Sequence, residues 1–163
     1  MSYHHIRPPF YMGIDPGLSG AIALLHDDGR LEVFDMPVGE LKVGGKTKRR
    51  IIPELLADII APCNGSVCAL EKVSAMPGQG VSSVFNFGSS WGMARGMLAV
   101  AQIEVIDAHP ATWKKHFRLT SSKDASRHKV CSMFPKQAGL FARVKDDGRA
   151  EAVLLAVYAR DIS

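Results

Sequence analysis

Two acidic residues stand at the ends of separate apolar segments of this sequence. Asp15 closes the run YMGID, and Glu71 lies near the end of VCALEKV. An acidic side chain in an apolar strand is costly unless it is paired or binds a metal ion. If both segments are strands of one sheet, the two acids can meet at one edge, where the ligand sites of α/β proteins gather. Either acid alone would suit a solvated loop, but the two together indicate a site.

A second acidic pair lies in the C-terminal segment KDDGRAEAVLLAVYAR. Asp147 and Glu151 are four residues apart, so both project from one face of a helix and repel each other. A divalent cation between them would reverse that repulsion. Asp146 is five residues from Glu151, roughly 140° around the helix, which makes it the weaker candidate. A carboxylate in the first helical turn also favours the helix dipole, which would explain Asp147 but not Glu151.

The four carboxylates are not accompanied by a cluster of histidines or cysteines. Oxygen ligands alone specify a hard cation, Mg²⁺ or Mn²⁺, rather than zinc. Paired metal ions ~3.5–4 Å apart are the usual device for phosphodiester hydrolysis. We therefore expect the four acids to hold two Mg²⁺ ions, with Mn²⁺ as a substitute, and to cut a phosphodiester backbone.

Hydrophobic periodicity predicts the elements that must position these acids. Strands are expected at 11–15, 20–26, 31–36, 67–73 and 103–107, and helices at 51–62, 81–101, 112–117, 122–134 and from near 147 onward. The first helix should bury Ile51, Leu55 and Ile59, and Ser121 or Ser122 should cap the fourth. Hairpin-linked strands followed by alternating strands and helices predict a mixed sheet flanked by helices, in one α/β domain spanning residues 1–163.

The basic residues are clustered rather than evenly spread. The formal net charge of +4 favours a polyanion only weakly by itself. Five of the nine residues at 42–50 are basic, and the glycine pair at 44–45 should make this segment flexible. Two further clusters lie at 114–118 and 123–129. Each could be a solvated face, but three in one small domain favour nucleic-acid binding. In the first cluster, the predicted DNA contacts are Lys46, Lys48, Arg49 and Arg50.

No feature of the chain indicates a membrane or secreted protein. No apolar run approaches the ~18–20 residues that cross a bilayer, and the segment MSYHHIRPPF lacks the apolar region of a signal peptide. Cys63, Cys68 and Cys131 form no CxxC pair and are odd in number, so they should be reduced. We expect a cytoplasmic protein with no membrane partner.

Several segments, taken in order, resemble the RuvC family of Holliday-junction resolvases, especially its phage-type branch. They are GIDPG, ALEKV, MPGQGVSSVFNFG, VIDAHPATWKK, SSKDASR and DDGRAEAVLLA, and they span nearly the whole chain. The resemblance implies an RNase H-like fold and a homodimer that uses Mg²⁺ to nick two opposed strands of a four-way DNA junction.

The resemblance also suggests roles for individual residues. Asp15 and Glu71 match the first two metal-binding carboxylates, and Asp147 with Glu151 matches the acidic pair on the last helix. Many bacterial members space that pair three apart rather than four. The remaining matches are to DNA contacts: Lys114 (or its neighbour Lys115) and Lys123 resemble phosphate-binding lysines, and Gln79 and Arg127 lie in matching segments.

One departure from the family pattern concerns DNA stacking. Bacterial members often carry an aromatic residue three positions after the strand glutamate, where this chain has Ser74. Met76, Phe85 or Phe87 could replace it as an apolar wedge against an unstacked base, with Phe85 as the predicted DNA contact. The alternative is that both phenylalanines pack in the core.

Glycines recur at every fourth position of the helix expected at 81–101. Gly88, Gly92 and Gly96 form a smooth stripe that allows another element to approach closely. The resemblance favours a dimer interface on this stripe, and packing against the protein's own sheet is the alternative.

Three other functions fit parts of the sequence. Actin-like and sugar-kinase ATPases also begin with a turn like GIDPG, but they need two such domains to enclose a nucleotide, and 163 residues supply one. A related RNase H-like nuclease acting on other branched DNA or on RNA/DNA hybrids remains open. So does a catalytically inactive DNA-binding relative, although all four acidic positions are occupied.

Overall fold

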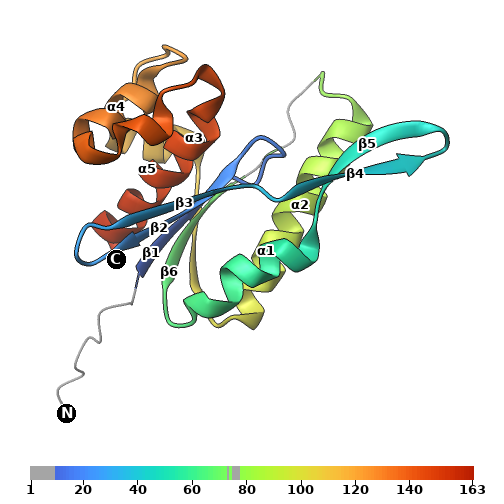
Figure 1. Cartoon of the computed structure of the whole chain (residues 1–163), viewed down its shortest axis with the longest axis horizontal. Coiled ribbons are helices and arrows are strands. Elements are labelled where there is room, and N and C mark those ends of the chain that lie inside the picture. The colour runs from blue at the N-terminus through green and yellow to red at the C-terminus, as the bar shows by residue number, and fades with distance from the viewer. Residues whose placement is uncertain (1–9, 73, 75–77) are drawn as a thin grey trace.

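Five strands form one mixed sheet in the order β3-β2-β1-β6-β7 (Figure 1). Strands β1, β2 and β3 are antiparallel, whereas β6 and β7 run parallel to β1. Their bounds are Phe10–Ile14 (β1), Ala21–His26 (β2), Leu31–Asp35 (β3), Val67–Glu71 (β6) and Glu104–Ala108 (β7). The structure is a computed structural model and describes residues 10–72, 74 and 78–163.

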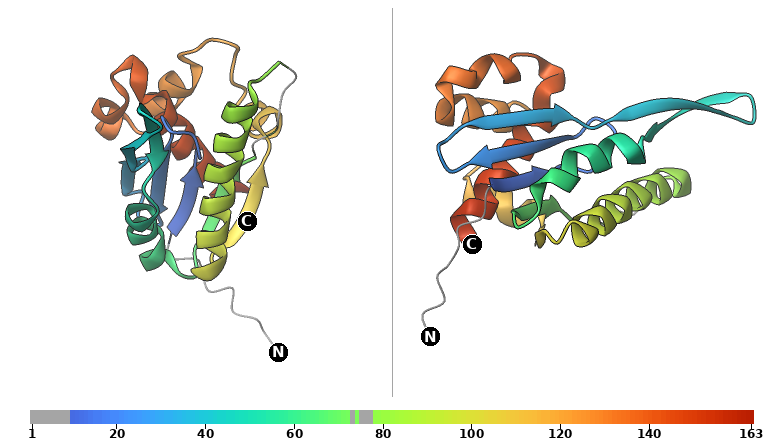
Figure 2. Two further views of the ribbon diagram at one scale, coloured as in Figure 1. Left: turned by 90° about the vertical axis from the view of Figure 1, so that its right-hand side faces the viewer. Right: turned by 60° about the horizontal axis from the view of Figure 1, so that its bottom comes forward.

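Helices cover both faces of the sheet, as Figures 1 and 2 show. Helix α5 packs on one face across β1, β2 and β6, and α4 packs on α5. Helices α1 and α2 contribute to the hydrophobic core on the other face. Their bounds are Pro53–Ile60 (α1), Val81–Val100 (α2), Pro110–His116 (α3), Ala125–Met133 (α4) and Asp147–Ile162 (α5). None of the described helices is both long and apolar enough to cross a bilayer.

The strands divide their side chains between two hydrophobic cores. Ala21, Ala23 and Leu25 of β2 join the core beneath α5, and Ile22 and Leu24 join the core beneath α1 and α2. This alternation follows from the period of two along a strand. Together with the helices on both faces, it gives the α/β sandwich of helix, sheet and helix that the sequence predicted.

Strand β1 and helix α5 are in direct backbone contact. A Cβ atom added at Gly13 would lie 2.0 Å from the carbonyl oxygen of Ala152 and 2.3 Å from the amide nitrogen of Ala156. Only glycine leaves room for such an approach. The contact matters because α5 carries the second acidic pair and β1 leads into Asp15.

The basic segment is a β-hairpin, which the sequence patterning did not predict. Strands β4 (Val38–Val43) and β5 (Lys46–Ile51) pair as an antiparallel hairpin that projects beyond the body of the molecule (Figure 2). Gly44 and Gly45 form its two-residue turn with φ of +58° and +74°, the left-handed pair that a type I′ turn requires. Because β5 is largely exposed, its sequence lacks the apolar alternation that marks a half-buried strand.

Two local predictions were wrong. Helix α1 begins at Pro53, so Ile51 belongs to β5, and the helix buries Leu56 and Ile60 while Leu55 is 48% exposed. Helix α4 begins at Ala125, with Asp124 rather than a serine as the preceding residue.

Candidate active site

Asp15 follows the last residue of β1 and is held in place by a tight loop. Its backbone N–H donates to the carbonyl of Ala21 at 3.1 Å, and its carboxylate accepts a 3.0 Å hydrogen bond from the N–H of Gly17. A Cβ atom at Gly20 would lie 2.1 Å from the carbonyl oxygen of Asp15. The loop therefore fixes the carboxylate at the edge of the sheet.

The first turn of α5 rests on the same loop. A Cβ atom at Gly148 would lie 2.3 Å from the carbonyl oxygen of Ser19, so the helix can approach this closely only with glycine there. As a result Asp147 and Glu151 lie beside Asp15, and the three carboxylates line one open cavity of about 490 Å³. Residues 15 and 147–151, distant in sequence, thus share one site.

Glu71 is the last residue of β6, the parallel neighbour of β1. Leu70 pairs with Ile14, so Glu71 and Asp15 end adjacent strands at the same level. The indole N–H of Trp113 donates to Glu71 Oε1 at 3.2 Å. Glu71 does not line the 490 Å³ cavity, but its charge interacts with those of Asp15 and Glu151.

Burial and mutual repulsion make ionised Asp15 and Glu71 unfavourable. Burial, followed by the charges of Asp15 and Glu151, raises the pKa of Glu71 to about 7. Burial is also the largest cause that raises the pKa of Asp15 to about 6; the charge of Glu151 adds to it, and the hydrogen bond from Gly17 opposes it. Carboxylates perturbed in this way are typical of functional sites.

Asp147 and Glu151 are each paired with a basic side chain. Arg127 Nε donates to Asp147 Oδ1 at 2.9 Å, and Arg127 also bonds Asp124. Lys114 Nζ lies 2.9 Å from Glu151 Oε1, and Ser126 Oγ lies 3.4 Å from the same oxygen. The two predicted DNA contacts Lys114 and Arg127 are therefore engaged with acids of the site, and the Arg127 side chain is only 11% exposed.

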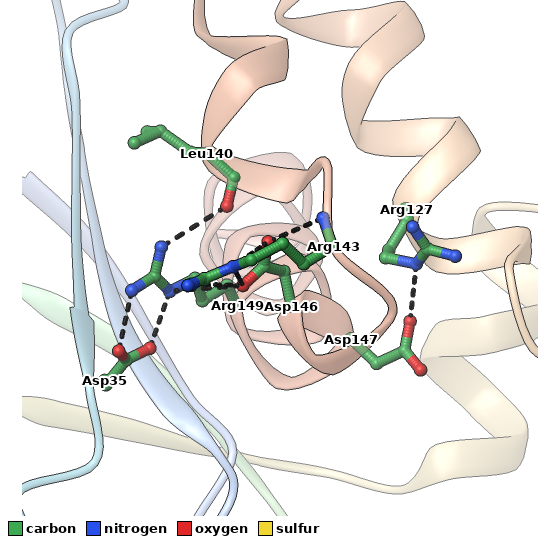
Figure 3. Close-up of polar contacts among 7 residues, drawn as sticks. All are labelled: Asp35, Arg127, Leu140, Arg143, Asp146, Asp147 and Arg149. Carbon is green, nitrogen blue, oxygen red and sulfur yellow. Dashed lines mark hydrogen bonds and ion pairs between the residues drawn. The ribbon is translucent and has the colours of Figure 1, made fainter.

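Asp146 and Asp147 are separated by their partners, as Figure 3 shows. The Asp146 side chain is 3% exposed and accepts hydrogen bonds from the backbone N–H and the guanidinium of Arg143 at 2.9 Å and 2.8 Å. These bonds hold the pKa of Asp146 below its usual range. Asp146 does not line the cavity that holds Asp15 and Asp147. It fastens the start of α5 instead.

The site fits a hard cation in its chemistry, because its acids supply oxygen donors alone. Within the described residues, however, no three Asp, Glu, His or Cys side chains are grouped as metal ligands. Three of the acids have partners in the protein instead: Arg127 bonds Asp147, Lys114 pairs with Glu151, and Trp113 bonds Glu71. A bound metal would have to compete with these partners.

The other predicted DNA contacts are exposed. Lys123 lines the 490 Å³ cavity, and Gln79 is exposed just before α2. On β5, the four basic residues Lys46, Lys48, Arg49 and Arg50 are exposed, and Arg49 Nη2 donates to the carbonyl of Leu18 at 3.3 Å. The base of the hairpin therefore reaches the loop that holds Asp15.

Both phenylalanines considered as wedges lie on the surface of α2. Phe85 is 73% exposed and Phe87 37% exposed, so the alternative that they pack in the core was wrong. Ser74 is exposed as well, and Met76 lies outside the described residues.

The glycine stripe of α2 does not pack against the sheet. Gly88, Gly92 and Gly96 are exposed, and a Cβ atom at any of them would meet nothing within 4 Å. The buried face of this helix carries Ser90, Ala94 and Leu98 instead. Gly92 and Gly96 border an apolar groove of about 620 Å³ between α1 and α2.

Sequence reasoning missed Trp113 and Ser126, which bond Glu71 and Glu151. Trp113 stands in the segment HPATWKK and is fully buried. Its place beside the acidic site depends on how α3 packs, and no spacing in the sequence indicates it.

Comparison with solved structures identifies the fold. RuvC of Thermus thermophilus matches with a TM-score of 0.52 and 17% identity, covering 92% of this chain and 95% of that one. The same protein in complex with a Holliday junction substrate matches with a TM-score of 0.58 and 14% identity, covering 93% and 94%. This chain has the RNase H-like fold of RuvC.

A third structure supports the same conclusion. The yeast mitochondrial Holliday junction resolvase Ydc2 matches with a TM-score of 0.51 and 16% identity, covering 94% of this chain and 78% of that one. No family model and no curated protein sequence matches the chain. The fold that the sequence resemblance predicted is thus confirmed, and it is recognised through structure.

Proposed function

We propose that this protein is a Mg²⁺-dependent endodeoxyribonuclease that resolves four-way DNA junctions by paired nicks. The observation that carries the proposal is the cavity lined by Asp15, Asp147 and Glu151, with Glu71 electrostatically coupled to it. The fold is shared with RuvC, solved with a Holliday junction, and with the resolvase Ydc2. Assignment to the phage-type branch remains a prediction from the sequence motifs.

Four carboxylates would hold the metal: Asp15, Glu71, Asp147 and Glu151. Burial and the charges of neighbouring acids raise the pKa values of Asp15 and Glu71, and a bound divalent cation would relieve this unfavourable burial of negative charge. Mg²⁺, in two ions per site, would supply activation of the attacking water and charge stabilisation at the leaving oxygen.

The protein's own residues would prepare this chemistry. The Gly17 N–H orients Asp15, and the indole of Trp113 orients Glu71. Lys114 and Arg127 form ion pairs with Glu151 and Asp147 and so orient these two carboxylates. Lys114, beside Glu151, and Lys123, at the edge of the cavity, would contact DNA phosphates near the cut.

Branched DNA would lie across the cavity and along the β4–β5 hairpin. The hairpin extends the basic surface away from the body of the molecule, and its base contacts the Asp15 loop through Arg49. Phe85, with its 73% exposed side chain, and Gln79 lie at the beginning of α2 and could contact a base at the branch.

A two-fold dimer would provide the two cutting sites that a junction with two equivalent strands requires. We propose that α2 forms its interface. The exposed glycines at 88, 92 and 96 permit a partner helix to approach, and Met97 and Val100 line the adjoining groove. Because the described residues of one chain form one cavity with this carboxylate cluster, a monomer would have to dissociate between nicks.

A substrate panel tests the proposal directly. Matched four-way junctions, flaps, linear duplexes and RNA/DNA hybrids would be incubated with Mg²⁺ and wild-type protein or Asp15→Asn. Paired nicks confined to the four-way junction and lost in the variant are expected. Preferred cutting of flaps or hybrids would instead show a nuclease that acts on other branched DNA or on RNA/DNA hybrids. Tight binding without cutting would show a catalytically inactive relative.

We propose that the protein acts in the cytoplasm. All three described cysteines are free, which suits a reducing compartment.

A further inference from the structure

A second cavity lies beside the one that holds the carboxylates. It measures about 300 Å³ and shares Ser19, Gly20 and Lys145 with the first. Arg49 from β5 and Arg143, which precedes α5, also line it. The two cavities are therefore neighbours, joined across the loop that positions Asp15.

Basic side chains with unused donors face this second cavity. Lys145 and Arg49 are exposed, and neither forms an ion pair with any other described residue. Arg49 is nevertheless held in place by its hydrogen bond to the carbonyl of Leu18. Arg143 uses Nε and Nη2 to bond Asp146, so its guanidinium is oriented while its side chain remains 54% exposed.

Two acids also line the cavity, but each is already neutralised. Asp35 accepts two 2.6 Å hydrogen bonds from Arg149, which hold the pKa of Asp35 below its usual range. Asp146 is bonded by Arg143 in the same manner, as Figure 3 shows for both pairs. The positive charges of Arg49 and Lys145 are therefore not balanced by these acids, and they make the cavity a site for an anion.

We propose that this second cavity binds a backbone phosphate of the cut DNA strand, adjacent to the phosphate that lies at the carboxylates. The inference rests on the proposed nuclease function and specifies the path of the DNA strand beyond the cut. Arg49 belongs to β5, so the strand would leave the acidic cavity past Ser19 and Lys145 and continue toward the base of the β4–β5 hairpin. A guanidinium held in a fixed orientation suits a phosphate, because it can donate two parallel hydrogen bonds.

Salt dependence of junction binding tests the inference without cutting. The double variant Arg49→Ala/Lys145→Ala would be compared with wild-type protein in EDTA, with Lys136→Ala as a control. Lys136 is an exposed lysine that lines neither cavity. The slope of log affinity against log salt should fall by about 0.9 in the double variant, because one phosphate contact is lost, and should stay unchanged in the control. Arg143 is left intact because it holds the buried Asp146.

Replacing one DNA phosphate by an uncharged analogue then shows which phosphate binds in the second cavity. A single methylphosphonate would be moved along the cut strand on either side of the scissile position. One position should weaken binding by wild-type protein and have no further effect on the double variant. The inference would be overturned if the methylphosphonate weakened binding equally in both proteins at every position, or if the salt slope were unchanged. Junction cutting by wild-type protein would still support the nuclease function in that case. A wild-type protein that binds no branched DNA would overturn both.

Discussion

Asp146 and Asp147 are adjacent in the chain, yet their carboxylates bond different arginines: Asp146 bonds Arg143 at 2.8 Å, and Asp147 bonds Arg127 at 2.9 Å. The first carboxylate is buried, and the second opens onto the cavity with Asp15 (Figure 3). One acid therefore fastens α5 to the preceding segment, and its neighbour is available to a metal.

Asparagine substitutions should separate the two acids. Asp147→Asn should reduce junction cutting by about 100-fold or more, since even outer partners of metal ligands cost roughly 10–100-fold. Its thermal stability should change little, because Arg127 keeps Asp124 as a partner. Asp146→Asn should instead lose about 2 kcal/mol of stability, or roughly 4–8 °C in melting temperature, through a weakened charge-assisted bond. Cutting rates are measured below both melting temperatures. If Asp146→Asn were the inactive variant, Asp146 rather than Asp147 would be the metal ligand.

The raised pKa values of Asp15 and Glu71 predict how stability depends on pH without metal. Both groups have folded-state pKa values above their usual ones, so their contribution to folding is favourable at low pH and is lost as pH rises toward about 6 for Asp15 and about 7 for Glu71. Asp15→Asn should therefore be more stable than wild-type protein at pH 8 in EDTA, by roughly 2–3 kcal/mol, and should show no gain at pH 4.

Thermal unfolding at both pH values, with and without Mg²⁺, checks this. Mg²⁺ should raise the melting temperature of the wild-type protein and have a smaller effect on Asp15→Asn, since the variant lacks one ligand. Asp27→Asn, at an exposed turn, serves as the control. A variant that is less stable than wild type at pH 8 would show that Asp15 is a structural acid.

The projecting hairpin should contribute to affinity for every DNA. Residues 46, 48 and 50 alternate along β5 and share one side of the ribbon, whereas Arg49 lies on the other. The triple variant Lys46→Ala/Lys48→Ala/Arg50→Ala should bind junctions and duplexes more weakly. Its salt slope should be lower by about 0.9 for each lost phosphate contact. Thr47→Ala, on the same strand, should match wild type; an unaltered slope in the triple variant would make the hairpin a solvated projection.

Leucine at Gly92 should break the dimer without harming the fold. A Cβ atom added at Gly92 meets nothing within 4 Å in the protomer, and replacing glycine inside a helix removes a local cost of roughly 1 kcal/mol. Loss of dimerisation would therefore reflect the interface itself. Gly139→Leu is the matched control, since that glycine is also open but lies in the 3-10 segment Pro135–Phe141.

Sedimentation and cruciform-plasmid cutting report the outcome. Coupled nicks linearise the plasmid, whereas uncoupled nicks only relax it. We expect linear product from wild type and the Gly139→Leu control, and relaxed product from Gly92→Leu. Wild-type protein that stays monomeric when saturated with junction would contradict the proposed interface.

Much of the fold could be predicted from local patterning. The strands of the main sheet are apolar or alternating and are bounded by turns such as Asp28-Gly29, so their periodicity identified them. The β4–β5 hairpin escaped because an exposed ribbon has no buried face to produce such a pattern. Helix α1 was shifted in register because Ile51 and Ile52 continue its apolar run although the helix begins at Pro53.

The sequence by itself determined which acids are available and that oxygen ligands would select a hard cation. It also placed Asp147 and Glu151 on one helical face, because that depends only on the helical period. The tertiary structure decided what surrounds them: Gly148 lets α5 press against the Asp15 loop, and Arg127 of α4 bonds Asp147. These contacts join residues that are 20 positions apart for Arg127 and Asp147 and more than a hundred apart for Ser19 and Gly148, and packing, which no local spacing encodes, selects them.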